Sequence, residues 1–248
     1  MRVSQLALPV GLKDSALLET FAAAGNEQIV SALRDLEAAA RPATGSAPRH
    51  SDYDLNLPLA PEPDTLKAAA VLVPLIQRDG LQVLLTRRTQ HLRHHAGQVS
   101  FPGGRVETDD DSPLAAALRE SEEEIGLPPE RVQPLGLLDD YETVTGFLVT
   151  PVVALVEPDV RLRLDSFEVS EAFEVPLSFV LDPSNHQVHA RERNGVLRRY
   201  FVFEYQHHYI WGATAGMLMN FYRRLNGLSA TMRPNLPTQQ PHRQPETP

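Results

Sequence analysis

The side chains that could bind a metal or take part in catalysis are concentrated in one acidic stretch. Between Glu107 and Glu124 there are eight acids and one base, and Glu120, Glu123 and Glu124 fall within one turn of a helix predicted over residues 113–125. Like charges at this spacing destabilise a helix, so the arrangement calls for a compensating cation. Carboxylate oxygens are the ligands that Mg²⁺ and Mn²⁺ prefer. The stretch therefore indicates a divalent metal site, with a solvated acidic face as the ordinary alternative.

The helix that carries these glutamates has well-marked ends. Ser112 is a good N-cap before Pro113 at the first helical position, and Gly126 supplies the stop. At about 100° per residue, the glutamates lie on a different face from the residues that pack on the core. By the same angle, Arg119 points away from the centre of the acid cluster. The expected core stripe is Leu114, Leu118, Ser121 and Ile125.

A cationic segment directly precedes the acidic one. From Leu84 to Arg105 there are four arginines, three histidines and no acid. The glycine turn Phe101-Pro102-Gly103-Gly104 joins the two segments. Arginines bind phosphate oxygens, carboxylates bind a metal, and a glycine turn brings the backbone close to both. Together they indicate metal-assisted attack on a polyphosphate.

These residues match a known pattern. The segment from Gly104 to Leu127 resembles the Nudix box, G x5 E x7 R E U x E E x G U, where U is aliphatic; its second half reads Arg119-Glu120-Ser121-Glu122-Glu123-Glu124-Ile125-Gly126-Leu127. Ser121 occupies an aliphatic position, and it can still face the core if its hydroxyl bonds to the carbonyl four residues earlier. Gly104 lies one residue further from Arg119 than usual, which leaves the first acid of the box open between Asp110 and Asp111.

The stretch before the box is similar to LLT x R [SA] x3 R x3 G x3 FPGG, the motif of coenzyme A diphosphatases. It reads Leu84-Leu85-Thr86-Arg87-Arg88-Thr89, then Arg93, Gly97 and Phe101-Pro102-Gly103-Gly104, with Thr89 in place of the usual serine or alanine. Segments at 150–153, at 167–169 with 175–177, and at 210–215 also look like that subfamily. The resemblance covers roughly residues 65–226.

The resemblance implies hydrolysis of the pyrophosphate bridge of coenzyme A or its thioesters to adenosine 3′,5′-bisphosphate and (acyl-)4′-phosphopantetheine, with Mg²⁺ or Mn²⁺ as cofactor. Glu120 and Glu124 are the expected principal metal ligands, and Glu123 is a third ligand or a base that positions water. Arg119 is expected to orient a carboxylate through an ion pair. Further candidates for the base are Glu168 and Glu171, and the expected substrate contacts are Arg87, Arg88, Arg93, Gly103 and Gly104, whose carbonyl could add a metal ligand.

Two other functions stay open. A Nudix hydrolase could instead cleave ADP-ribose or another nucleoside diphosphate derivative, since members of the family differ mainly outside the box. A Nudix-shaped module could also sense a nucleotide without cleaving it. Modules of that kind usually lose a box carboxylate, and Glu120, Glu123 and Glu124 are all present here.

The strands and helices expected around these residues indicate an α/β fold. Short β-rich runs at 69–75 and 81–86 flank the hairpin signal Arg78-Asp79-Gly80. Further strands are expected at 97–101, 135–138, 148–156 and 199–205, and helices at 113–125 and 213–225. We expect a Nudix-type α/β/α sandwich with a mixed sheet. The predicted organisation is a helical N-terminal arm (1–40), a proline-rich linker (41–65), the Nudix domain (66–228) and a disordered tail (229–248).

Composition narrows the class of protein. The 248 residues include no cysteine, which excludes disulfides, thiolate metal sites and a cysteine nucleophile. The net charge of -9 argues against a dedicated nucleic-acid binder. No apolar run approaches the roughly 20 residues of a membrane span. We expect a cytoplasmic enzyme of a small-molecule substrate, with no membrane or nucleic-acid partner and with a homodimer left open.

Overall fold

The fold is built around one large mixed sheet. A computed structural model describes residues 50–56, 66–92, 94–193 and 195–226. The strands of this sheet are β1 (His50–Ser51), β2 (Lys67–Arg78), β3 (Gly80–Arg88), β4 (Val99–Ser100), β5 (Gly103–Arg105), β6 (Val132–Leu137), β7 (Tyr141–Glu142), β8 (Phe147–Val156) and β9 (Val169–Pro176). Their order is β1-β7-β8-β2-β3-β4, with β5 on β2, β6 on β8 and β9 on β3. Because β2 runs parallel to β8 and antiparallel to β3, the sheet is mixed.

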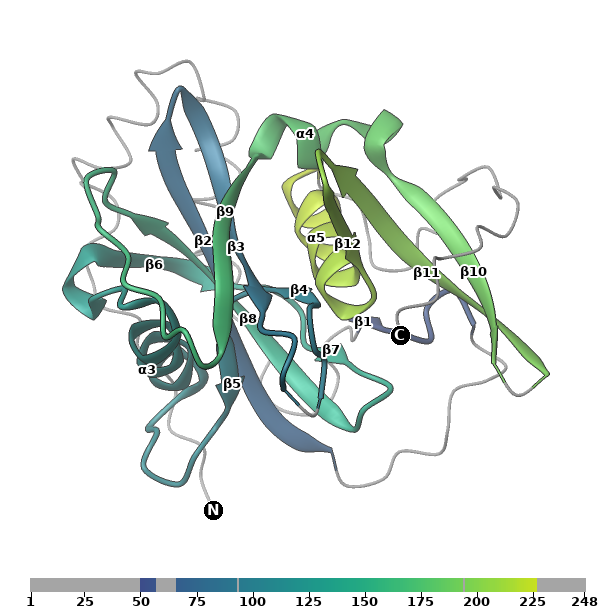
Figure 1. The fold of residues 1–248 in the computed structure, drawn as a ribbon, viewed down its shortest axis with the longest axis horizontal. Helices are drawn as coiled ribbons and strands as arrows, with labels where there is room; N and C mark the ends of the chain where they lie inside the picture. Colours follow the sequence, from purple (N-terminus) through teal and green to yellow (C-terminus); the bar gives the residue numbers. More distant parts are fainter. Residues whose placement is uncertain (1–49, 57–65, 93, 194, 227–248) are drawn as a thin grey trace.

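Two layers cover this sheet (Figure 1). Helix α3 (Pro113–Ile125) packs on one face. The other face carries α5 (Ala213–Leu225) and a three-stranded antiparallel sheet of β10 (Gln187–Arg193), β11 (Val196–Tyr205) and β12 (His208–Trp211). The short helix α4 (Leu177–Leu181) and the 3-10 turns η4 (Pro129–Arg131) and η5 (Pro183–Asn185) lie in connections. The expected Nudix-type α/β/α sandwich is confirmed, and one of its layers contains strands as well as a helix.

The hairpin β2–β3 shows how the sequence produces two cores. Arg78 pairs with Gly80, whose φ of 90° suits the tight turn at Asp79. Successive side chains of a strand point to opposite faces, so each strand contributes to both layers. Leu72, Ile76 and Leu84 pack in the cluster under α3, whereas Val73, Leu75 and Leu85 pack in the cluster under α5 and β10–β12. A strand buried on both faces reads as a nearly continuous apolar run, as β2 does.

Most expected elements are present with small changes at their ends. Helices α3 and α5 have the predicted bounds, 113–125 and 213–225. The strands expected at 69–75, 81–86, 148–156 and 199–205 are β2, β3, β8 and β11, and the run at 97–101 contains the two-residue β4. The run at 135–138 overlaps β6, which begins three residues earlier. The strands β1, β5, β7, β9, β10 and β12 were not predicted.

Residues 50–56, which fall inside the expected linker, pack against the sheet. β1 pairs in parallel with β7, and His50 is buried. The Asn56 side chain donates to the Arg199 carbonyl at 2.7 Å and accepts from the Arg199 N–H at 2.9 Å. The predicted arm (1–40), the rest of the linker and the tail (229–248) lie outside the described residues, and the domain boundaries stay a prediction.

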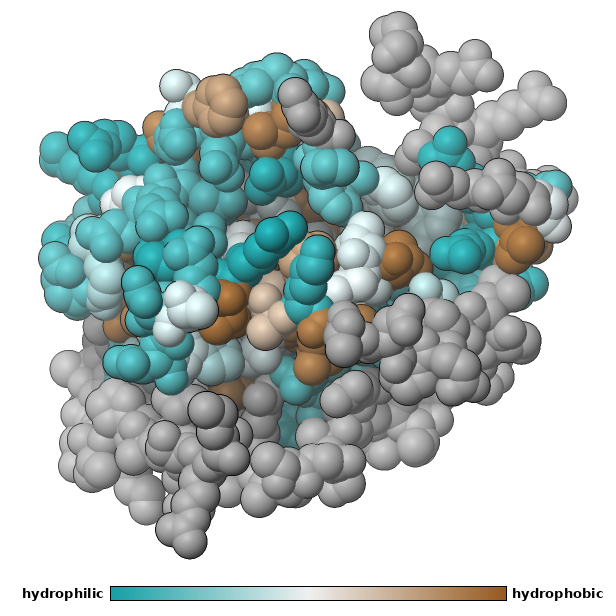
Figure 2. All heavy atoms as spheres, turned by 90° about the horizontal axis from the view of Figure 1, so that it is seen from below, coloured by the Kyte–Doolittle hydropathy of each residue, from teal (hydrophilic) through white to brown (hydrophobic). Residues whose placement is uncertain are grey.

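The surface of the described residues is mainly polar where Figure 2 shows it. On that face hydrophilic side chains predominate, and hydrophobic ones appear in small groups between them. The large hydrophobic residues that are exposed are Val144, Phe167 and Leu197. Within the described ranges, no helix combines the length and apolar character needed to cross a membrane.

Candidate active site

Helix α3 presents its glutamates from a firmly fixed position. The Ser112 hydroxyl accepts from the Ala115 N–H at 3.1 Å, and Gly126, at φ 62°, closes the helix by donating to the Glu122 carbonyl at 2.9 Å. Ser121 is fully buried, and its hydroxyl donates to the Ala117 carbonyl at 2.6 Å. The back-bond expected for this serine is therefore present, and it allows a polar residue to occupy the core-facing position.

Strand β5 brings backbone against the helix at the two glycines of the turn. The Gly103 N–H donates to Glu124 Oε2 at 3.1 Å. A Cβ added at Gly104 would lie 2.4 Å from Glu120 Oε1 and 2.5 Å from its carboxyl carbon. Only a glycine leaves the Glu120 carboxylate in this place, so the sequence Gly103-Gly104 positions both acids.

The two acids lie in a site that disfavours their charge. Glu124 is 4% exposed, and burial raises its pKa to about 7; the bond from Gly103 and the charge of Arg88 oppose this shift, whereas Glu120 and Glu168 add to it. Burial also raises the pKa of Glu120, and Arg119 opposes that shift. Two desolvated carboxylates that repel each other form a donor set suited to a hard divalent cation. The residues present therefore fit Mg²⁺ or Mn²⁺.

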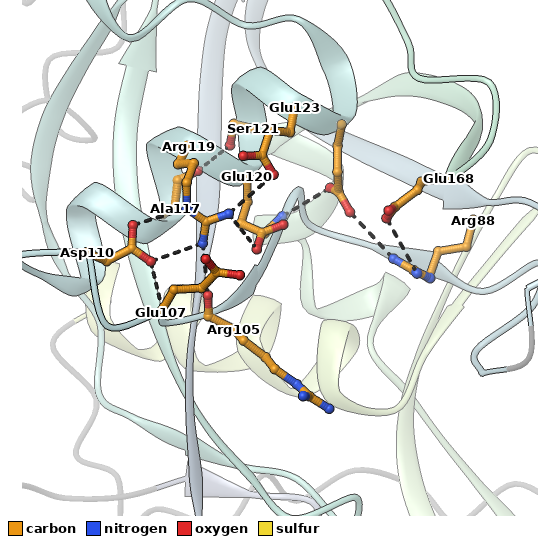
Figure 3. A network of polar contacts seen from close by, with 12 residues as sticks. Arg88, Arg105, Glu107, Asp110, Ala117, Arg119, Glu120, Ser121, Glu123 and Glu168 are labelled. Atoms are coloured by element: carbon orange, nitrogen blue, oxygen red, sulfur yellow. Dashed lines mark hydrogen bonds and ion pairs between the residues drawn. The ribbon is translucent and has the colours of Figure 1, made fainter.

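Arg119 binds several acids at once (Figure 3). It donates from Nε and Nη2 to the two Asp110 oxygens at 3.1 and 3.0 Å, and from Nη1 to Glu120 Oε1 at 3.1 Å and Glu123 Oε2 at 3.2 Å. Nη2 also donates to the Arg105 carbonyl at 3.1 Å. The expected ion pairing of Arg119 with carboxylates is therefore present, although its helical angle points away from the centre of the acid cluster. Helical angle fixes only the start of the side chain, and the long arginine folds back.

The Asp110 carboxylate takes the first acid position of the box. Its pKa is lowered, mainly by the hydrogen bonds from Arg119, and the pKa of Arg119 is raised for the same reason. Of Asp110 and Asp111, the two candidates for the first acid of the box, Asp110 is the one that Arg119 contacts. Among Glu120, Glu123 and Glu124, Glu123 is the most exposed, with 61% of its side chain accessible.

The arginines of the upstream motif separate onto two faces of β3. Arg88 reaches the acid cluster, with Nη1 3.5 Å from Glu124 Oε1 and Nη2 3.9 Å from Glu168 Oε2. Arg87 points to the other face, where its Nε lies 3.6 Å from Glu171 Oε2. The structure thus brings Glu168 to the cluster and places Glu171 across the sheet. Arg93 lies outside the described residues.

The segment before β9 is tied to the end of β3. Thr89 donates its N–H to the Glu168 carbonyl at 2.9 Å and its hydroxyl to the Phe167 carbonyl at 2.8 Å. These bonds hold Glu168 beside Arg88. The Arg88 Nε is buried and has no hydrogen-bond partner among the described residues.

The sequence model of the NUDIX domain matches residues 66–194, more than half of the chain. The chain belongs to the Nudix family. Its members are hydrolases of diphosphate anhydrides that generally need divalent cations.

Similar Nudix hydrolases come from several bacteria. An uncharacterized Nudix hydrolase, NudL, from Enterobacter sp. (strain 638) is 45% identical over 152 residues, which are 61% of this chain and 79% of that one. The protein of the same name from Escherichia coli (strain K12) is 44% identical over 152 residues, with the same coverage. Among solved structures, the Nudix hydrolase RenU from M. smegmatis has a TM-score of 0.46 and 18% identity, covering 67% of this chain and 90% of that chain.

One aromatic pair near the Nudix site was not predicted. Phe167 is 64% exposed, and its ring centroid lies 4.8 Å from that of His91. Phe167 directly precedes Glu168 in the chain. The sequence did not predict this pair, although Phe167 lies in a segment that resembles the coenzyme A diphosphatases. Whether a single aromatic side chain is exposed depends on the tertiary fold.

Proposed function

We propose that this Nudix hydrolase cleaves the pyrophosphate bridge of coenzyme A or its thioesters. The placement of Arg88 carries the proposal. This motif arginine lies beside the buried Glu124 and has a buried Nε without a partner among the described residues. A guanidinium with a spare donor next to metal-binding carboxylates suits a bridging phosphate. The similarity of residues 84–104 to coenzyme A diphosphatases supports this choice of substrate.

We assign Mg²⁺ or Mn²⁺ to Glu120 and Glu124, with Glu123 as the third ligand if it is not the base. When bound, the cation neutralises charge on the phosphate oxygens and lowers the pKa of a coordinated water. The Gly103 N–H fixes one oxygen of Glu124, and Gly104 leaves room for the Glu120 carboxylate.

Arg119 acts in this proposal as a positioning residue. It joins Asp110, Glu120 and Glu123, so it holds the helix acids in one arrangement despite their mutual repulsion. A bidentate arginine is suited to this because its donors form a rigid fork. Its loss is therefore expected to disturb several carboxylates together.

Glu168 is the proposed base that accepts the proton of the attacking water, and Glu123 is the alternative. The Glu168 carboxylate is 43% exposed and lies on the segment that Thr89 ties to β3, so it combines solvent access with a fixed backbone. If Glu168 is the base, Glu168→Gln lowers kcat without changing the affinity for Mg²⁺, and Glu123→Gln weakens Mg²⁺ binding. The reverse pattern assigns the base to Glu123.

Phosphate contacts are proposed for Arg88 first. Arg87 faces the other side of β3, so its contact with substrate would involve a part of the molecule distant from the acids. Arg93 lies beyond the described residues. Both remain predictions.

A substrate panel tests the proposal. Purified protein is given coenzyme A, acetyl-coenzyme A, ADP-ribose or NADH with Mg²⁺ or Mn²⁺, and the products are separated. We expect the two coenzyme A compounds to give adenosine 3′,5′-bisphosphate with the highest kcat/KM. Preference for ADP-ribose refutes the substrate and leaves the metal site standing. Absence of cleavage with every compound and both metals refutes the enzymatic function and favours a nucleotide-sensing module.

A further inference from the structure

A second group of metal-ligating side chains lies across the sheet from the Nudix glutamates. It consists of Glu171 on β9, His208 at the start of β12, and His207 in the turn before it. One ligand atom from each side chain lies within 4.8 Å of the others. None of these residues contacts the Glu120–Glu124 cluster in the bonds described above. The proposed Nudix metal site therefore does not explain why these three side chains lie together.

The distances around the Glu171 carboxylate are those of atoms that can share one ion. His208 Nε2 lies 3.0 Å and His207 Nε2 lies 3.7 Å from the same oxygen, Glu171 Oε1. Ligands about 2.1 Å from a tetrahedral zinc are separated from one another by about 3.4 Å. The two distances bracket this value, so small side-chain movements would place all three atoms around a single ion.

Two of the ligands are held in place by packing. The His208 side chain is 2% exposed, and its ring stacks on Phe173 with centroids 3.5 Å apart and planes 11° apart. The other Glu171 oxygen faces Arg87 Nε at 3.6 Å, which leaves Oε1 for the histidines.

The third ligand comes from a strained turn. His208 pairs with Tyr205 across the β11–β12 hairpin, so Gln206 and His207 form a two-residue turn, and Gln206 has a φ of 53°. A positive φ is uncommon for a residue other than glycine. The turn sets the His207 ring 4.0 Å from that of His208. His207 is 66% exposed on its side chain, so an ion can reach the group from solvent.

We propose that Glu171, His207 and His208 form a second metal site, which binds Zn²⁺ or a similar transition-metal ion rather than Mg²⁺. Two imidazoles and one carboxylate are a ligand set that suits zinc, nickel or copper, whereas Mg²⁺ prefers oxygen ligands. The three residues belong to different sheets, since β9 is in the large sheet and the β11–β12 turn is in the small one. The bound ion would link the two sheets. This site is independent of the substrate proposed for the Nudix glutamates.

Zinc titration of the full chain tests the site. Calorimetry is done with excess Mg²⁺, which occupies the carboxylate site, and Zn²⁺ is then added. We expect wild-type protein to bind a zinc ion that Mg²⁺ does not displace and to gain thermal stability from it. His207→Ala removes an exposed ligand and should weaken this binding at least about 10-fold, and it should abolish the gain in stability.

Two further variants make the result specific. Glu171→Gln removes a second ligand, and it should weaken zinc binding in the same way if the group is one site. His94→Ala replaces an exposed histidine elsewhere and should leave zinc binding unchanged. Absence of zinc binding by wild-type protein overturns the proposal, and so does wild-type affinity in both His207→Ala and Glu171→Gln. Neither result affects the substrate panel.

Discussion

Glu124 is the residue whose replacement separates catalysis from stability most clearly. It is 4% exposed, and its pKa of about 7 compares with an ordinary value of 4.5, chiefly because of burial. Glutamine has nearly the same size and no charge. In the Glu124→Gln variant the cost of holding a buried charge disappears, and a charged metal ligand disappears with it.

The size of the stability effect follows from the two pKa values. The folded protein binds this proton more tightly than the unfolded chain, so stability is fully present below pH 4.5 and is lost as the pH rises through about 7. At about 1.4 kcal/mol per pH unit, wild-type protein without metal loses about 3 kcal/mol. The attraction to Arg88 is already included in this pKa. We therefore expect metal-free Glu124→Gln to be about 3 kcal/mol more stable than wild type at about pH 8, and similar at about pH 4.

Urea unfolding in EDTA at both pH values measures this difference, and steady-state assays with Mg²⁺ measure turnover. We expect turnover of Glu124→Gln to fall by more than about 100-fold. Glu122→Gln is the matched control, because Glu122 is on the same helix and exposed; both its stability and its turnover should stay near wild type. Equal stability of wild type and Glu124→Gln at about pH 8 would refute the reasoning about burial. Near-normal turnover would refute the assignment as a ligand.

Three other substitutions test the surrounding structure. Gly104→Ala places a Cβ 2.4 Å from Glu120 Oε1, so kcat should fall about 100-fold in steady-state assays with little change in melting temperature; unchanged kcat contradicts the positioning of Glu120. Arg88→Ala should mainly raise KM, by about 10-fold or more, because phosphate binding is lost; a change in kcat alone argues against that role. Gly216→Ala would place a Cβ 2.1 Å from the buried Tyr141 hydroxyl, and urea unfolding should show a loss of about 1–3 kcal/mol with the site unaffected.

Secondary structure was predicted best where it is determined by residues close together in the chain. Helix α3 was predicted at both ends because Ser112, Pro113 and Gly126 determine its ends through bonds within a few residues. The β2–β3 hairpin was predicted for the same kind of reason. Of the strands that were missed, β10 forms a local hairpin with β11, whereas β1, β5 and β7 are short and β9 pairs with β3, far along the chain. The formation of β1, β5, β7 and β9 depends on the tertiary fold more than on propensity.

The same limit applies to the site. Neighbouring residues such as Arg87 and Arg88 appear as one cationic cluster in sequence, but alternation along β3 sends them to opposite faces. Likewise, Glu168 and Glu171 were both candidates for the base beside Glu123, and the pairing of β3 with β9 places Glu168 near Arg88 and Glu171 near Arg87. Distinguishing them requires the register of a strand that the sequence did not reveal.

The apolar cluster between the large sheet and the layer of α5 and β10–β12 limits how far the chain can be shortened and still fold. The family match ends at residue 194, but the apolar cluster on that side of the large sheet includes Phe201, Phe203, Ile210 and Phe221. A fragment trimmed to the matched segment would leave that face of the large sheet bare. The glutamates of α3 would then be carried by a sheet with one side open to water. We therefore predict that an independently folding fragment must extend through α5 to residue 225 and include β1.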